Sequence, residues 1–216
     1  MPSAVPLDPP QRLVRSLSSQ HGHAGEPLGR AGGDWLEGLP SLLARMLDRW
    51  DLRLERVVSP GGRSSLVALV QQADGSPAAL KLLAPYLYSA RERAEQESTA
   101  LTCWNGWGAV RLLRSDAEDG ALLLERLHGE MSLRSLPEAK ATLEAASAAR
   151  RLWVSPLEAG EDSGTGGLRT VAANTAASSE FLRSSTPEEA WPLRDEALEI
   201  REALLADPSE EVLLHG

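Results

Sequence analysis

The sequence predicts an α+β fold in which a five-stranded antiparallel sheet with one helix is followed by helices alone. Short apolar runs typical of strands are confined to the segment after Trp50, and Asp74-Gly75 lies between two of them, a strong signal for a tight antiparallel hairpin. From Ser132 onward, apolar residues recur only at helical spacing. We therefore divide the chain into an extension with an amphipathic helix (1–50), a sheet-bearing lobe (51–128) and a helical lobe (129–216).

The composition fits one domain or two small ones. Of 216 residues 42% are hydrophobic, and the net charge of -9 argues against a generic nucleic-acid binder and favours a cationic or neutral small substrate. Cys103 is the single cysteine, so no internal disulfide is possible. No apolar run approaches the roughly 20 residues of a bilayer span, and the N-terminus shows no secretory pattern. We expect a cytoplasmic protein that contacts neither membrane nor nucleic acid.

The N-terminal third is expected to be helical in two places. A weak helical stretch covers 11–19, and the His-Gly-His sequence at 21–23 predicts no metal site because no Cys or carboxylate cluster lies nearby. A stronger helix is expected from Asp34, which forms a capping-box pattern with Glu37, and this helix should bend or restart at Pro40. Its apolar face comprises Leu39, Leu42, Leu43, Met46, Leu47 and Trp50.

The sheet is expected to follow directly. The charged segment 89–104 predicts a helix between the third and fourth strands, so the order is β-β-β-α-β-β. A second hairpin-like turn at 116–120 joins the last two strands. The expected strands are 52–58, 66–71, 78–83, 110–113 and 121–127.

Two helix starts are predicted in the C-terminal part. Ser135 and Thr186 each stand three residues before a Glu, as in a capping box. In both cases a Pro lies between the hydroxyl residue and the Glu, near the expected start of the helix, where Pro is tolerated. A Gly/Ser-rich loop at 160–167 and a weaker helix at 170–182 lie between them, and residues 211–214 predict a further strand whose open apolar face would promote association. The two helices carry apolar stripes of Leu136, Ala139, Leu143, Ala146 and Trp153, and of Ala190, Leu193, Ala197, Ile200 and Leu204.

This order of elements is the one that a two-lobed kinase needs. Phosphoryl transfer from ATP requires a flexible loop over the phosphates, a Lys on the third strand, a Glu on the following helix and a main-chain hinge for adenine. Gly61, Gly62, Arg63 and Ser64 lie between the first two strands, where glycine lets the backbone approach phosphates. The alternative is a plain hairpin turn, because the loop has neither the Walker pattern nor a full Gly-x-Gly-x-x-Gly.

Lys81 is one of only two lysines among 22 basic residues, and it stands inside the third predicted strand. Its neighbours along the strand are leucines that face the other side, so its charge needs a partner. Glu97 is the first candidate, and Glu92 and Glu95 compete with it. The alternative is that all three carboxylates merely solvate the helix.

Five longer segments carry a more specific signal. They resemble the aminoglycoside phosphotransferases, in particular the streptomycin and hydroxyurea phosphotransferase branch, over about residues 34–216. The segments are Trp35-Leu36-x-x-Leu39-Pro40, Leu47-Asp48-Arg49-Trp50, the run from Trp104 to Leu113, Leu122-Leu123-Leu124-Glu125-Arg126-Leu127, and Val212-Leu213-Leu214-His215-Gly216.

The resemblance implies ATP-dependent phosphorylation of a hydroxyl on a small molecule, such as the aminoglycoside streptomycin, or of hydroxyurea. It implies that Lys81 contacts the nucleotide phosphates, that Glu97 holds this lysine, and that main-chain groups from Glu125 to Leu127 bind adenine. In the family, the segment written here as 214–216 continues into an Asp that positions the acceptor, then an Asn and a second Asp that hold Mg²⁺. We therefore expect ATP and Mg²⁺ as cofactors, no catalytic or metal-ligating residue within this chain, and no phosphorylation by the chain alone.

Two further interpretations stay open at this point. The chain could be a non-catalytic nucleotide-binding or interaction module with a kinase-like sheet, or a functionless remnant. The expected partners are a nucleotide and a small-molecule acceptor, whereas acceptor identity, regiochemistry and oligomeric state do not follow from the sequence.

Overall fold

The computed structural model describes residues 7–18, 28–85, 88–129, 132–155, 168–206 and 212–213. The histidine pair at 21–23, the loop at 160–167 and residues 214–216 lie outside the described residues, as does half of the strand predicted at 211–214. Leu213 is described, and its N–H donates to the carbonyl of Val154 at 2.9 Å.

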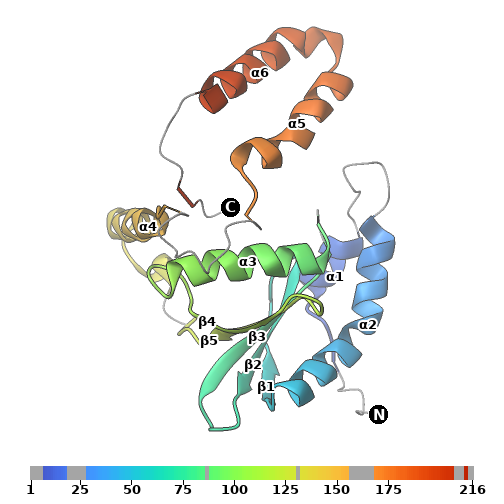
Figure 1. Ribbon diagram of the computed structural model, residues 1–216, viewed down its shortest axis with the longest axis vertical. Helices are drawn as coiled ribbons and strands as arrows, with labels where there is room; N and C mark the ends of the chain where they lie inside the picture. Colours follow the sequence, from blue (N-terminus) through green and yellow to red (C-terminus); the bar gives the residue numbers. More distant parts are fainter. Residues whose placement is uncertain are drawn as a thin grey trace.

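A five-stranded antiparallel sheet forms the centre of the fold, in the order β1-β2-β3-β5-β4 (Figure 1). This confirms the five predicted strands and the hairpin between the second and third, where Gly75 has a φ of +82°. The strands are β1 (Arg53–Val57), β2 (Ser65–Gln71), β3 (Pro77–Leu83), β4 (Leu112–Asp116) and β5 (Ala121–Glu125).

Strand β4 differs from its predicted range of 110–113, because it begins at Leu112 and continues through polar residues to Asp116. Its later residues pair with β5, Ser115 with Leu122 and Asp116 with Ala121. Pairing with an apolar neighbour, rather than local hydrophobicity, therefore sets its extent.

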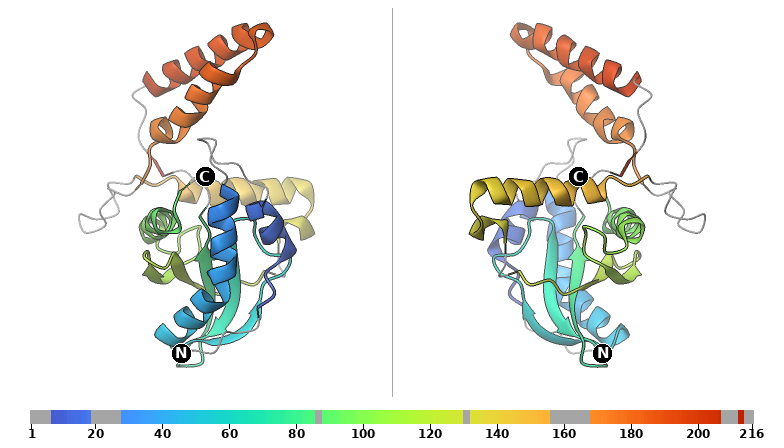
Figure 2. Two further views of the ribbon diagram at one scale, coloured as in Figure 1. Left: turned by 90° about the vertical axis from the view of Figure 1, so that its right-hand side faces the viewer. Right: turned by 90° about the vertical axis from the view of Figure 1, so that its left-hand side faces the viewer.

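Helices cover both faces of the sheet (Figure 2). The helices α1 (Gln11–Ser18) and α2 (Leu28–Arg49) pack on one face, and α3 (Ala90–Trp104) packs on the other. Leu13 and Leu17 of α1 are fully buried, so the N-terminal extension completes the core although its helical signal is weak. The first core combines Leu39, Leu43 and Met46 of α2 with Leu66, Ala68, Val70, Leu80, Leu82 and Leu123 of the sheet.

The helix predicted from Asp34 starts earlier, at Leu28, so the capping box of Asp34 with Glu37 is wrong. Packing on α1 explains the longer helix, because a Cβ on Gly32 would lie 3.0 Å from the carbonyl oxygen of Leu17. Pro40 lies inside α2, and Figure 1 shows the helix changing direction along its length.

The two capping boxes predicted in the C-terminal part are also wrong. The Ser135 hydroxyl donates to the Ser132 carbonyl at 2.7 Å in the short 3-10 helix η1 (Leu133–Ser135), and α4 (Glu138–Leu152) starts after Pro137 without a side-chain cap. The Thr186 hydroxyl donates to the Leu182 carbonyl at 2.6 Å at the end of α5 (Val171–Ser185). In both places the hydroxyl bonds a carbonyl of the preceding turn, which competes with capping the next helix. A second 3-10 helix, η4 (Glu188–Ala190), precedes α6 (Trp191–Ala206).

The apolar stripes predicted on α4 and α6 remain largely exposed. Leu143 is 69% exposed and Leu193 is 70% exposed. Figure 1 shows α5 and α6 side by side and away from the sheet, and no described element covers these stripes. Within the described ranges, no helix combines the length and the apolar character that a membrane span requires.

Candidate nucleotide site

Helix α3 is fixed on the sheet by its start and by its apolar side. Ser89 is the N-cap, and it forms a capping box with Glu92 that the sequence analysis missed: the Glu92 N–H donates to Ser89 Oγ at 3.2 Å and the Ser89 N–H to Glu92 Oε2 at 3.0 Å. The hydrogen bonds from Ser89 hold the pKa of Glu92 below its usual range. On the other side, α3 buries Ala94, Leu101 and Trp104 against Leu83, Leu122 and Leu124.

Lys81 and Glu97 form the ion pair that the sequence predicts. Lys81 pairs in the sheet with Val67 and Leu122, on the face that α3 partly covers. Its Nζ lies 2.6 Å from Glu97 Oε1, with the side chains 23% and 29% exposed. The competing carboxylates are occupied elsewhere, Glu92 at the helix cap and Glu95 with Arg91 at 2.9 Å. The pair is therefore a specific contact between β3 and α3.

The sheet face beside Lys81 is only half covered. Ala79 pairs with Leu69 and Leu124, and Lys81 with Val67, so these side chains share one face by strand alternation. Helix α3 covers this face over β5, where Leu122 and Leu124 are buried. Over β2 and β3, by contrast, Val67, Leu69 and Ala79 remain half-buried. We call Val67, Leu69 and Ala79 the open strip. It is an apolar surface next to an ion pair.

The predicted phosphate loop lies at one end of the open strip. Gly61 has a φ of +70°, and a Cβ there would lie 3.0 Å from Pro10 Cγ, so this position requires glycine. Gly62 has ordinary room for a Cβ, 3.5 Å from Ser65. Arg63 is exposed. Ser64 is held by Arg93 of α3, whose Nη2 lies 3.1 Å from the hydroxyl.

The segment after β5 lies at the other end of the open strip. The Glu125 N–H already donates to the Arg111 carbonyl at 2.9 Å, and the Glu125 carboxylate accepts from the Arg111 N–H at 2.8 Å. None of the main-chain hydrogen bonds in the described loops involves Arg126 or Leu127. The N–H of Glu125 is therefore already engaged within the fold.

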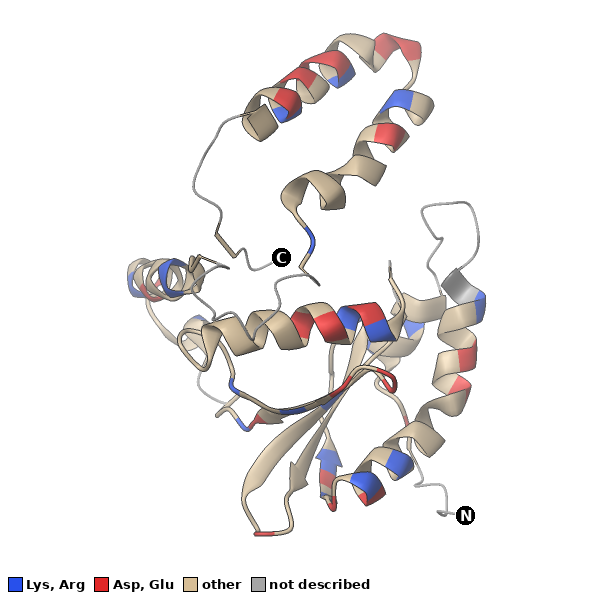
Figure 3. Ribbon diagram, in the orientation of Figure 1, with Lys and Arg blue, Asp and Glu red and all other residues tan. Residues whose placement is uncertain are grey.

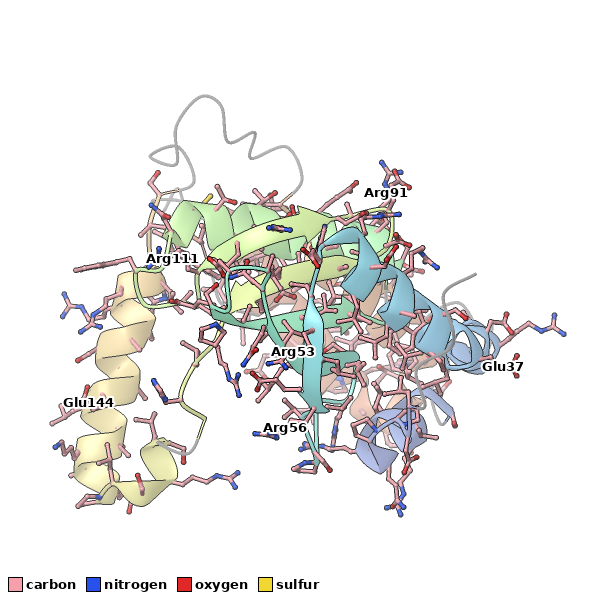
Figure 4. The ribbon with its side chains drawn as sticks, turned by 90° about the horizontal axis from the view of Figure 1, so that it is seen from below. Glu37, Arg53, Arg56, Arg91, Arg111 and Glu144 are labelled. Carbon is pink, nitrogen blue, oxygen red and sulfur yellow. The ribbon has the colours of Figure 1, made fainter. Side chains whose placement is uncertain are left out.

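An ion pair between Arg126 and Glu55 was not foreseen from the sequence. Arg126 Nη1 lies 2.7 Å from Glu55 Oε2, and both side chains are 26% exposed. Because β2 and β3 lie between β5 and β1, the ion pair spans two strands. It lies on the open face of the sheet, since α1 and α2 cover the other face. Figure 4 shows Arg53 and Arg56 on the same side of β1 as this connecting segment.

Helix α3 contributes several charged residues next to the site. Figure 3 shows acidic and basic residues interleaved along its first half, where Arg93 bonds to the carbonyl of Ala84 just after β3. In the described part of the chain, no group of three or more His, Cys, Asp or Glu side chains could hold a metal ion. Two shallow surface hollows, around Asp51 and Gly75 and around Leu101 and Arg114, do not include Lys81.

Comparison with known proteins identifies the family. Residues 49–216 match the model of the aminoglycoside/hydroxyurea antibiotic resistance kinase family. The chain belongs to this family. Its kinase-like α+β fold, with a five-stranded antiparallel sheet and helices, is the one predicted from the sequence.

Two curated relatives are named as a streptomycin kinase and a hydroxyurea phosphotransferase. The chain is 42% identical over 129 residues to streptomycin 6-kinase from Streptomyces griseus, covering 56% of this chain and 40% of that one. It is 40% identical over 173 residues to hydroxyurea phosphotransferase from Kitasatospora aureofaciens, covering 77% of this chain and 45% of that one. The chain thus spans less than half the length of these relatives.

Two solved structures are more distant matches. A choline/ethanolamine kinase family protein from Mesorhizobium loti has a TM-score of 0.46 at 22% identity, covering 76% of this chain and 51% of its own. A Rio2 kinase complex with ADP/Mg²⁺ and phosphoaspartate from Chaetomium thermophilum has a TM-score of 0.37 at 13% identity, covering 52% and 40%.

Proposed function

We propose that this chain carries the ATP-binding part of a phosphotransferase that acts on a hydroxyl of a small molecule, an aminoglycoside such as streptomycin, or on hydroxyurea. The observation that carries the proposal is the ion pair of Lys81 with Glu97, 2.6 Å long, beside the open strip. The family supports the same reaction class, and its two relatives above are named for these acceptors. The acidic net charge of -9 suits a cationic acceptor.

Each part of the site has a proposed role toward the nucleotide. Lys81 donates from Nζ to the phosphates, and Glu97 keeps the ammonium aimed at them. The main chain of Gly61, Gly62, Arg63 and Ser64 contacts the same phosphates, and the open strip contacts the base. Arg126 and Leu127 offer main-chain groups to adenine. The Arg126–Glu55 ion pair bounds the open strip at the end where this segment lies. Glu125, whose carboxylate accepts from the Arg111 N–H, is proposed to support this segment and to belong to the same adenine site.

Magnesium has no assigned ligands here. The described residues hold no acidic cluster that fits a divalent cation, although Mg²⁺ accompanies ATP in this chemistry. None of the described residues is proposed as the catalytic base. Residues 51–128 are proposed as the nucleotide lobe, and 129–216 as part of a helical lobe.

The test replaces Lys81 with Ala in the full chain and measures the dissociation constants of ATP and adenosine by calorimetry. We expect ATP to bind about 10- to 100-fold more weakly, the effect of losing charge-assisted hydrogen bonds, with adenosine nearly unchanged. Lys140→Ala is the matched control, because Lys140 is the other lysine and is exposed on α4. Unchanged ATP affinity in Lys81→Ala, or an equal loss in Lys140→Ala, would contradict the proposed site.

The alternative is a non-catalytic interaction module, and the exposed apolar side chains of α4 and α6 favour it. Under this alternative the chain self-associates or captures a partner, and wild-type protein shows no saturable ATP binding. The same calorimetric titration therefore separates the two functions.

A further inference from the structure

Arg93 joins three parts of the nucleotide site through one guanidinium group. It lies on α3, half-buried. Its Nη1 donates to the Ser64 carbonyl at 2.8 Å and also to the carbonyl of Ala84, and its Nη2 donates to the Ser64 hydroxyl at 3.1 Å. Helix α3, the end of the glycine-rich loop and the end of β3 therefore meet at this side chain.

The strand and the loop are also bonded to each other at this point. The Ala84 N–H donates to the Ser64 carbonyl at 3.0 Å, so this carbonyl accepts from both Ala84 and Arg93. An arginine suits the position because its planar fork presents several N–H donors at fixed angles. A lysine ammonium has no such fork and could not reproduce the same set of bonds.

Arg93 and Glu97 are four residues apart on α3, so they lie on the same side of the helix. Glu97 holds Lys81 on β3, while Arg93 holds Ser64 at the end of the loop. One face of one helix thus fixes both groups that are proposed to contact phosphate. The neighbouring Arg91 points elsewhere, toward Glu95 and Glu118.

We propose that Arg93 is a positioning residue that holds the glycine-rich loop in register with Lys81, so that loop and lysine bind the nucleotide phosphates together. The inference rests on the proposed function and adds a residue to it. A loop released from Arg93 has more conformations to lose when phosphate binds, so affinity for phosphate-bearing ligands falls. Adenosine does not reach the loop, and its affinity stays the same.

The experiment compares Arg93→Gln, Arg93→Lys and the control Arg91→Gln in the full chain, with ATP, ADP and adenosine as probes. We expect Arg93→Gln to bind ATP and ADP about 3- to 10-fold more weakly, the effect of one or two lost hydrogen bonds, and to bind adenosine as before. Arg93→Lys should show most of the same loss, whereas Arg91→Gln should bind all three ligands like wild type.

A second variant and a second measurement cover the case in which Arg93→Gln does not fold. Ser64→Ala removes only the hydroxyl contact, and we expect a smaller loss, about 2-fold, confined to ATP and ADP. Hydrogen exchange at the amides of residues 61–65 should be faster in Ser64→Ala than in Arg91→Gln without any ligand.

Three results would overturn the inference. These are unchanged ATP affinity in both Arg93→Gln and Ser64→Ala, an equal loss for ATP and adenosine, and unchanged exchange in the loop. If Lys81→Ala weakens ATP binding while the Arg93 and Ser64 variants do not, the proposed function stands and only the role of Arg93 fails. If wild type binds no ATP, both fail.

Discussion

Replacement of Asp119 by Asn tests how helix α2 is held to the turn between β4 and β5. The Asp119 carboxylate is 17% exposed and lies 2.6 Å from Arg45 Nη2 and 3.0 Å from Arg49 Nη1. Exposed ion pairs contribute about 0.2–1 kcal/mol each, and charge-assisted hydrogen bonds about 1.5–3 kcal/mol. Because the arginines are 46% exposed, we expect the lower part of this range, about 1–2 kcal/mol in total. For a chain of this size that lowers Tm by about 2–8 °C.

The effect should also depend on pH with a defined sign. The hydrogen bond from Arg45, together with the charges of Arg45 and Arg49, holds the pKa of Asp119 below its usual range. A carboxyl group with a lowered folded pKa stabilises the fold fully above its unfolded pKa, about 3.9, and loses this contribution as pH falls through the folded value. The difference in Tm between wild type and Asp119→Asn should therefore be constant from about pH 7 to 5 and shrink below about pH 4.

The assay is thermal unfolding followed by circular dichroism between pH 3 and 7. Glu118→Gln is the control, because Glu118 occupies the same turn with a side chain that is 74% exposed, and it should change stability by no more than about 0.5 kcal/mol. A double-mutant cycle with Arg45→Gln measures the coupling directly. An unchanged Tm at pH 7, or a difference in Tm that is as large at pH 3 as at pH 5, would refute the reasoning.

Two further predictions concern stability alone. Ser89→Ala removes the capping box of α3 and should lower the free energy of unfolding by about 1 kcal/mol, measured by urea denaturation, and an unchanged midpoint would show that the cap is dispensable. Leu80→Ala creates a cavity at a fully buried position and should lower the free energy of unfolding by about 2–5 kcal/mol. Leu143→Ala, at a position 69% exposed, should stay within about 0.5 kcal/mol in the same assay, and equal losses for the two would contradict the described core.

The sheet could be predicted from the sequence because its signals are local. Alternating apolar runs and the Asp74-Gly75 turn set the first three strands almost to the residue. The pair of Lys81 with Glu97 could also be predicted, since a charge inside a strand needs a partner and α3 follows directly. Their binding to a nucleotide remains a prediction.

The helix starts could not be predicted reliably, because a hydroxyl near a helix has more than one acceptor or donor within reach. Ser135 and Thr186 fit the capping pattern but bond to carbonyls behind them, and α2 extends to Leu28 through packing on α1. The contacts of Arg93 with Ser64 and of Arg126 with Glu55 join residues far apart in sequence. The spacing of Arg93 before Glu97 was the one local signal that could have identified the first of them.

The two outer strands of the sheet differ from the inner ones in a way that affects contacts between molecules. Strands β1 and β4 form the edges, and each has a register irregularity, between Leu54 and Arg56 and between Leu112 and Arg114. A bulge and charged side chains interrupt the row of unpaired N–H and C=O groups that a foreign strand would need. Two copies of this sheet are therefore poorly suited to join edge to edge into a continuous sheet. Any self-association of the chain should instead involve the exposed apolar faces of its C-terminal helices.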